Sequence, residues 1–320
     1  MRKYAGRFSA AGNWTYPLFL LLGSCGLSAQ TSQPTGYVDV ATPLAVLQDA
    51  RIAEASGIVA SRRQADCFYV HNDSGNRPRV FLIDRAGRTR AEIRLRGAQA
   101  IDYEDIAIAP GDAPGTFDVC VADIGDNLVQ RPNVTIYRFA EPDLPATEGG
   151  VVEVEPIAYA ARYADGPVNA EAFLVDPRTG EGLVFTKHLE GRCDVYKLAA
   201  PWDSHTQAVL TKVLALELPS GFPPARVVTA ADVDRDGRRV AVRCMVGGWE
   251  WRATTTTAPV SIVELLRTTP ADLPLPPERQ GEALCYAADG GALLTVSEGA
   301  SPTLFELRAV APTTSQASGN

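Results

Sequence analysis

Four glutamates stand at similar places in the chain, each at the start of a short apolar stretch. These are Glu54, Glu104, Glu171 and Glu282, and Thr229 takes the same place between the last two. They recur about every 50 to 70 residues, a period typical of repeated structural units. Carboxylates that converge repel one another unless they are protonated, solvated or neutralised by a cation. Because Ca²⁺ takes six to eight oxygen ligands, the four glutamates are candidate calcium ligands.

A structural role for these glutamates is the alternative. A carboxylate at the start of an inner strand can accept hydrogen bonds from backbone N–H groups of the next repeated unit and so join the two. A second acidic segment, Asp232-Val-Asp-Arg-Asp-Gly, resembles the opening of an EF-hand loop, but Arg243 stands where the twelfth-position glutamate should be. We therefore expect a hairpin turn there.

Polar clusters follow the second apolar stretch of each unit, and the richest are His-Asn-Asp-Ser-Gly at 71–75 and Asp-Ile-Gly-Asp-Asn at 123–127. The residues expected to bind a ligand share this position: Asn72, Asp73, Asp123, Asp126, Asn127, Lys187, Arg243, Trp249 and Glu298. Cations beside carboxylates and a metal suit a phosphate or carboxylate substrate. Asx turns are the alternative role for Asp123, Asp126 and Asn127. Trp249 and Trp251 form either a stacking wall or a packed contact.

Two histidines, His71 and His188, each end such a second stretch. Either is a candidate catalytic residue, as a general base or a ligand, and a hydrogen-bonded structural histidine is the alternative. The sequence has no GxSxG elbow, HExxH helix, Walker loop or dinucleotide fingerprint after a strand. Whether the protein is an enzyme is left open by these residues.

The elements that must position these residues are β-strands. Apolar and β-branched stretches bounded by Gly, Asp and Pro predict strands in five similar units, and no convincing amphipathic helix. We expect an all-β fold, a single β-propeller over 37–310 with five four-stranded blades, with six blades as the alternative. The third strands include 194–198 and 260–265, and the outer strands are expected at 89–95, 151–158, 209–216 and 273–275.

The last unit lacks an outer strand, whereas a strand-like segment at 38–47 precedes the first unit. This segment would complete the last blade and so close the ring without exposed edges. In a four-stranded antiparallel blade, the loop entering the inner strand and the loop between the second and third strands emerge on one face. The glutamates and the polar clusters should therefore meet there.

The N-terminus predicts export. Arg2, Lys3 and Arg7 precede a short apolar run, 16–22, that is too short to span a bilayer. Residues 1–24 are expected to be a lipoprotein-type signal peptide that leaves a lipid anchor on Cys25, and cleavage after Ala29 is the alternative. A flexible tether (25–36) and a disordered tail (311–320) would flank the propeller. The expected location is the periplasm, the outer membrane or the outside of the cell.

Composition limits the partners. The formal net charge is −8 and becomes more negative without the basic residues of the signal peptide, which argues against binding nucleic acid. We expect a monomer whose partner is an unidentified small molecule or protein. Five cysteines follow Cys25, without metal-binding spacing: Cys67, Cys120, Cys193, Cys244 and Cys285. We expect them to be mostly buried, with at most one or two disulfides.

Four phrases carry a resemblance: EASGIVAS…HNDSGN, DYEDIAIAPG…ADIGDN, NAEAFLVDPRTG and GEALCYAADGGALLTVSEG. Over about residues 45–308 the chain resembles an uncharacterised family of exported bacterial β-propellers. More distantly it is similar to five-bladed calcium-dependent nucleotidases (apyrases) and to phytase-like esterase propellers. The nucleotidases hold calcium in the central channel, which implies the same role for Glu54, Glu104, Glu171 and Glu282; Thr229 departs from that acidic pattern.

Two functions follow as expectations. The first is an exported cell-envelope propeller with a calcium-binding acidic centre that presents a ligand- or protein-binding face. The alternative is a secreted metal-dependent hydrolase of phosphoesters or other esters, which would use His71, Lys187, His188 and Arg243 beside the carboxylates. A purely structural propeller is a third possibility, since the fold supports all three.

Overall fold

The computed structural model describes residues 36–38, 40–145, 147–189, 191–219, 226–253 and 259–310, all within one compact unit, 33–320. The expected signal peptide, Cys25, the cleavage site after Ala29, the tether up to residue 35 and the tail 311–320 lie outside this part. The described residues form 21 strands and one helix of four residues. None of the helical structure in these ranges is long and apolar enough to cross a membrane.

The first sheet has five strands. Four form an antiparallel meander: β2 (Ala55–Ala60), β3 (Cys67–Asn72), β4 (Arg79–Asp84) and β5 (Thr89–Leu95). The fifth, β9 (Gly150–Val154), pairs in parallel with β5.

The second sheet has eight strands and consists of two antiparallel groups. The first group is β6 (Tyr103–Pro110), β7 (Phe117–Asp123), β8 (Val134–Ala140) and β10 (Ile157–Tyr163). The second is β11 (Ala170–Val175), β12 (Gly182–Thr186), β13 (Arg192–Leu198) and β14 (Ala208–Glu217). A parallel pairing of β10 with β14 joins the two groups. The edge strands β6 and β11 contact each other, so this sheet is nearly closed.

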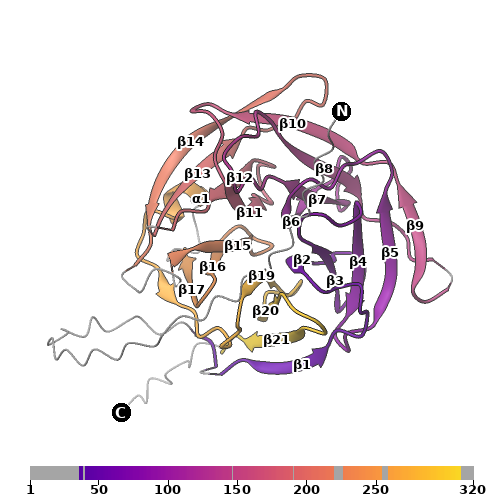
Figure 1. Cartoon of the computed structure of the whole chain (residues 1–320). Helices are drawn as coiled ribbons and strands as arrows, with labels where there is room; N and C mark the ends of the chain where they lie inside the picture. Colours follow the sequence, from indigo (N-terminus) through magenta and orange to yellow (C-terminus); the bar gives the residue numbers. More distant parts are fainter. Residues whose placement is uncertain are drawn as a thin grey trace, which may run out of the picture. The chain divides into compact units, whose positions relative to one another are not determined.

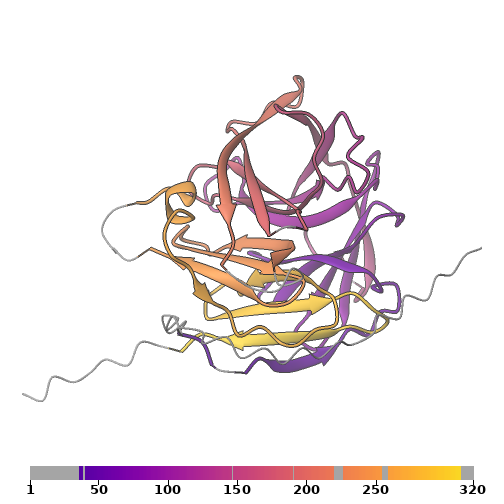
Figure 2. The ribbon, with the colours of Figure 1, turned by 60° about the vertical axis from the view of Figure 1, so that its left-hand side comes forward.

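The last two sheets have four strands each. One is β15 (Val228–Val233), β16 (Arg239–Cys244), β17 (Gly248–Arg252) and β18 (Ala271–Asp272). The other is β19 (Gly281–Tyr286), β20 (Ala292–Ser297), β21 (Thr303–Arg308) and β1 (Thr42–Val46). The N-terminal strand β1 pairs antiparallel with β21, as the surplus segment at 38–47 predicts. Figure 2 shows β1 in indigo beside the yellow strands of the chain end.

Five strands, one from each four-stranded group, lie next to one another around a common centre (Figure 1). In chain order they are β2, β6, β11, β15 and β19, and each contacts the next, with β19 returning to β2. Nearly all of their residues are buried, and many are Ala, Gly or Ser, because both faces of each strand meet a neighbour. Strands farther out alternate between buried and exposed positions, as in β10.

Polar side chains join the inner strands to one another. Asp105 in β6 is fully buried, and its carboxylate accepts backbone N–H groups from Ile106 (2.9 Å), Phe173 in β11 (2.9 Å) and Ala231 in β15 (3.2 Å). Three further bonds cross between sheets: Ser56 Oγ to Glu104 O, Thr229 Oγ1 to Gly281 O, and Tyr286 N to Asp232 Oδ2, each at 2.8 Å. Aspartate, serine and threonine thus take the joining role that was the alternative for the glutamates.

All five cysteines after Cys25 are free and buried. Burial is the first cause that raises the pKa of each of their thiols, for example that of Cys120 to about 12. They act as small apolar core residues, and the one or two disulfides that the sequence left open are not formed.

Three local predictions are wrong. The strand expected at 260–265 is instead the helix α1 (Ile262–Leu265), because Ser261 and Glu264 form a capping box at its start. The third strand of that sheet is β17. The outer strand expected at 151–158 is two strands, β9 and β10, interrupted at Pro156, which has no N–H to donate. The outer strand expected at 273–275 is the two-residue β18.

Replacing Asp105 with alanine should destabilise the fold. The substitution leaves the buried N–H groups of Phe173 and Ala231 without their acceptor, at about 1–3 kcal/mol for each. We expect urea denaturation to give a loss of roughly 3–5 kcal/mol for Asp105→Ala, less for Asp105→Asn, and almost none for the exposed control Asp236→Ala. Equal stabilities of the three variants would contradict this joining role.

Candidate functional site

Three carboxyl groups converge where the inner strands begin. Asp73, Asp102 and Glu104 each offer an oxygen atom, and these atoms lie within 4.8 Å of one another. Asp73 follows β3, Asp102 directly precedes β6, and Glu104 is the second residue of β6, at a register shift between Tyr103 and Asp105. Two oxygens bound to one Ca²⁺ at 2.3–2.6 Å lie at most about 5 Å apart. The spacing of the three groups therefore suits one shared ion.

Backbone hydrogen bonds hold the loops of this face together. In each case a residue after the second strand of a sheet donates to a residue at the entry of the inner strand. Asp73 N donates to Glu54 O (2.8 Å), Gly125 N to Asp102 O (3.2 Å) and Lys187 N to Asn169 O (3.0 Å). The two kinds of loop thus meet on one face, as expected.

Gly125 makes room for the three carboxyl groups. A Cβ atom at this position would lie 2.1 Å from Glu104 Oε1 and 2.4 Å from Asp102 Oδ2. Its neighbour Asp123 is buried, forms an ion pair with Arg131 (2.8 Å), and accepts the backbone N–H groups of Ile101 and Asp102 at 3.2 and 3.1 Å. Asp123 therefore positions Asp102 and is not one of the three converging carboxyl groups.

Further charged groups surround this cluster. Glu171 is buried, and its Oε1 lies 2.9 Å from Lys187 Nζ and accepts a hydrogen bond from Asn169 Nδ2 (3.2 Å). Glu298 Oε2 accepts a hydrogen bond from Gln280 Nε2 (2.7 Å). Glu54 is exposed, and its Oε2 accepts one from Asn76 Nδ2 (2.8 Å).

Burial and mutual repulsion disfavour negative charge in this region. Glu104 is only 4% exposed, and burial, followed by the charges of Glu171, Asp73 and Asp102, raises its pKa well above the ordinary value. Burial, with the charges of Asp73 and Glu171, raises the pKa of Asp102 to about 6. Burial raises the pKa of Glu282 to about 7, against the lowering effect of Lys187. A bound cation would relieve the repulsion that adds to the effect of burial in these shifts.

The four predicted glutamates are not equivalent. Glu104 belongs to the cluster, and the charge of Glu171 contributes to the raised pKa of Glu104. Glu282 is buried near Lys187 and Glu171, whereas the side chain of Glu54 is exposed to solvent. Burial also raises the pKa of Glu298, aided by the charges of Asp73 and Glu54.

Three predicted ligand-binding residues build the loops. Asn72 is buried, and its Nδ2 donates to Arg51 O (2.6 Å). Asp126 accepts the N–H of Arg131 at its Oδ2 (2.7 Å) and donates its own N–H to Asn169 Oδ1 (2.7 Å). Asn127 Oδ1 accepts a hydrogen bond from Asn169 Nδ2 (3.2 Å). For Asp126 and Asn127, these contacts agree with the alternative role, in which the side chain stabilises its loop.

The two candidate catalytic histidines lie in different surroundings. His71 is fully buried, with Nδ1 3.0 Å from Asn72 O and its ring edge-on to Tyr103. A Cβ at Gly57 would lie 2.3 Å from His71 Nε2, and burial lowers the pKa of His71 to about 4. His71 is therefore a neutral packed side chain without access to a substrate. His188 is half-buried next to Lys187, and its Nε2 has no partner among the described residues.

The structure does not place Arg243 or Trp249 on the exposed face. Arg243 is 1% exposed, forms an ion pair with the buried Glu278, and donates to Ala283 O (3.3 Å), so it joins two sheets. Trp249 and Trp251 lie in the core between the sheets of β13 and β16, and Trp251 Nε1 donates to Thr268 O (3.1 Å). Both tryptophans therefore form packed contacts, which was the alternative to a stacking wall for a ligand.

Sequence reasoning missed Asp102 and did not count Asp73 as a metal ligand. The local signal was the pair of carboxyl groups in Asp102-Tyr-Glu104, but a register shift between Tyr103 and Asp105 interrupts the regular strand alternation there. The role of Gly125 depends on a contact with another loop of its group and has no local signal.

The comparisons with known proteins give no relative for this site. No protein-family model matches the chain, and no curated protein matches it. Its interpretation therefore depends on the geometry and chemistry of the residues above.

In EDTA, which removes divalent cations, the protein should lose stability as the pH rises from 5 to 8. Asp102 and Glu282 titrate near 6 and 7 in the folded protein, against about 4 when unfolded. The folded state thus binds more protons than the unfolded state in this pH range. The stability present at lower pH is therefore lost as the pH rises through the pKa values of the folded protein. Each group contributes on the order of 2 kcal/mol. The melting temperature in EDTA should fall as the pH rises, and Glu282→Gln should make this fall smaller. A melting temperature that increases with pH would contradict these pKa shifts.

Gly125→Ala should disrupt the carboxylate cluster. The new methyl group would overlap Glu104 Oε1 and Asp102 Oδ2 and push them apart. The affinity of this cluster for Ca²⁺, the ion that the sequence predicts, should then fall at least about tenfold in isothermal titration calorimetry, because ligand spacing determines the coordination geometry. The matched control is Gly291→Ala, where the nearest atom is the side chain of the exposed Asp289 at 3.2 Å. Similar affinities for both variants would contradict the role of Gly125.

Proposed function

We propose that the chain forms a five-bladed β-propeller. The support is the closed order of contacts among β2, β6, β11, β15 and β19, each at the inner edge of a four-stranded antiparallel group. The pairing of β1 with β21 would close the last blade with strands from both ends of the described region. In this arrangement the acidic cluster lies at one mouth of a central channel.

We propose that this mouth binds Ca²⁺ through Asp73, Asp102 and Glu104, with Glu171 adjacent. The observation that carries the proposal is the convergence of three carboxyl groups, one almost fully buried, within the span of a single ion. Their oxygen atoms are hard ligands, which Ca²⁺ prefers. A divalent cation would supply the charge that the raised pKa values of Glu104 and Asp102 call for.

Lys187 partly compensates the carboxylates in the absence of calcium. Its Nζ pairs with Glu171, and the charges of Glu171, Glu282 and Glu104 raise the pKa of Lys187 against the effect of burial. The lysine and a bound cation therefore oppose each other. Removing the lysine charge should strengthen calcium binding, whereas removing a carboxylate should weaken it.

We propose further that the same face binds a partner or ligand. Large apolar side chains are exposed beside the acidic residues: Ile101, Leu128, Val129 and Leu189. Val129 has a φ of 52°, a left-handed conformation that is strained for a β-branched residue. The bonds of Asp126 to Val129 N (2.9 Å) and to Arg131 N keep the loop in this shape. Strain held in a rigid exposed loop is typical of binding sites.

The cellular setting of the proposal is the envelope or the outside of the cell. It depends on the export signal at 1–24 and on the lipid anchor proposed for Cys25. The hydrolase alternative is weakened by the burial of His71 and of Arg243. Of its proposed catalytic groups, only Lys187 and His188 remain near the mouth.

Calcium titration of the mature domain tests this function. We expect saturable binding with one site, a raised melting temperature in excess calcium, and a larger rise at pH 8 than at pH 5.5, because protons and calcium compete. Glu104→Gln should weaken binding by at least about tenfold, and Lys187→Met should strengthen it about threefold or more.

The matched control for Glu104→Gln is Glu155→Gln on the exposed outer surface, which should bind calcium like the unaltered protein. Absence of binding to the unaltered protein would overturn the calcium proposal. Equal weakening by Glu104→Gln and Glu155→Gln would place the ion elsewhere.

A further inference from the structure

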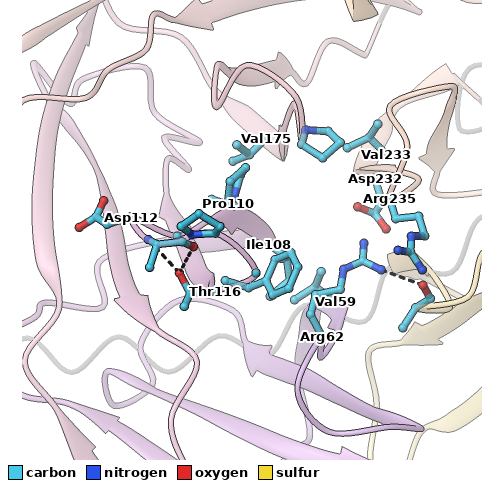
Figure 3. Close-up of a pocket in the computed structure, with 18 residues that line it drawn as sticks. Val59, Arg62, Ile108, Pro110, Asp112, Thr116, Val175, Asp232, Val233 and Arg235 are labelled. Atoms are coloured by element: carbon cyan, nitrogen blue, oxygen red, sulfur yellow. Dashed lines mark hydrogen bonds between the residues drawn. The ribbon is translucent and has the colours of Figure 1, made fainter.

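The inner strands border an open cavity where they end, away from the acidic mouth where they begin. It has a volume of about 590 Å³ and is lined from the far ends of β2, β6, β11 and β15 and from the residues after them (Figure 3). This volume lies in the range of small-molecule sites. None of the residues proposed for calcium binding belongs to its lining.

One part of the wall of this far-end cavity is apolar. Val59, Ile108, Val175 and Val233 come from four different inner strands and lie around its opening. Prolines 110, 114 and 177 and Phe117 extend this wall. Such a surface excludes water from a bound apolar group and favours its burial.

Two guanidinium groups supply the charge at the edge of the cavity. Arg62 and Arg235 lie on the same side of it, next to Asp232, whereas Asp112 points away from the opening in Figure 3. Arg62 Nη1 donates to Ala288 O (3.0 Å), and Arg235 Nε lies 3.7 Å from Asp236 Oδ1. A guanidinium has five N–H donors, so most of their donors remain available for an anion.

Asp232 does not cancel these cations. Its Oδ2 already accepts the backbone N–H of Tyr286. Burial raises its pKa to about 7, although the charge of Arg62 acts in the opposite direction. At neutral pH the carboxyl group therefore carries only part of a negative charge, and the side of the cavity formed by the two arginines stays cationic.

We propose that this far-end cavity binds a small organic anion with an apolar body, its carboxylate held by Arg62 and Arg235. The apolar part lies against Val59, Ile108 and Val175. The site is separate from the calcium site and does not require a metal.

Three matched probes test this proposal: benzoate, benzyl alcohol and benzylammonium, which share one apolar ring and differ in charge. Saturation-transfer NMR and calorimetry in EDTA should show benzoate binding about tenfold more tightly than benzyl alcohol, and benzylammonium most weakly. Arg62→Gln should lower the affinity for benzoate about tenfold and change the affinity for benzyl alcohol less than twofold. Pro177→Trp, in an exposed turn of the wall, should block all three probes.

The control is Arg96→Gln, an exposed arginine after β5 that pairs with Glu153, and it should leave benzoate binding unchanged. Melting curves should show that all variants fold. Three results would each overturn the proposal: no probe binding at millimolar concentration, benzylammonium binding as tightly as benzoate, or benzoate affinity unaffected by both Arg62→Gln and Pro177→Trp. Because EDTA is present, none of these outcomes depends on the calcium site.

Discussion

Asp105 joins three of the five inner strands that pack around one centre. Its carboxyl group is completely buried and accepts backbone N–H groups from β6, β11 and β15. Burial raises its pKa well above the ordinary value, while these three N–H groups lower it. The group thus exchanges solvation for bonds that fix three strands at once. The position of the loops at both ends of the inner strands depends on this arrangement.

The strand pattern of the sequence was enough to predict much of this architecture. Alternating and continuous apolar stretches separated by Gly, Asp and Pro turns predict the all-β class and the segments that become β2, β3, β11 and β12. The surplus N-terminal segment predicts the pairing of β1 with β21. The pattern failed where a local signal was stronger: the Ser261–Glu264 capping box started a helix, and Pro156 divided a strand.

The site was less accessible from sequence because its members depend on distances across loops. Repetition singles out Glu104 and Glu171, but it ranks Glu54 equally, although that side chain is exposed. Asp102 lies outside the repeated pattern and belongs to the cluster. Lys187 was placed correctly beside the carboxylates, whereas Arg243, similar in sequence position, is buried against Glu278. Burial decides between such residues, and burial is set by contacts between distant segments.

The pairing of β1 with β21 ties the order of folding to the order of translation. The last sheet contains residues 42–46 and 303–308, so it cannot assemble until almost the whole described chain has emerged. Until β21 is available, β1 has no partner strand. The unpaired edge of β1 is then open to pairing with other chains. Contacts of such long sequence separation also slow folding. The sheet that joins the two ends of the described chain is therefore also the last that can be completed.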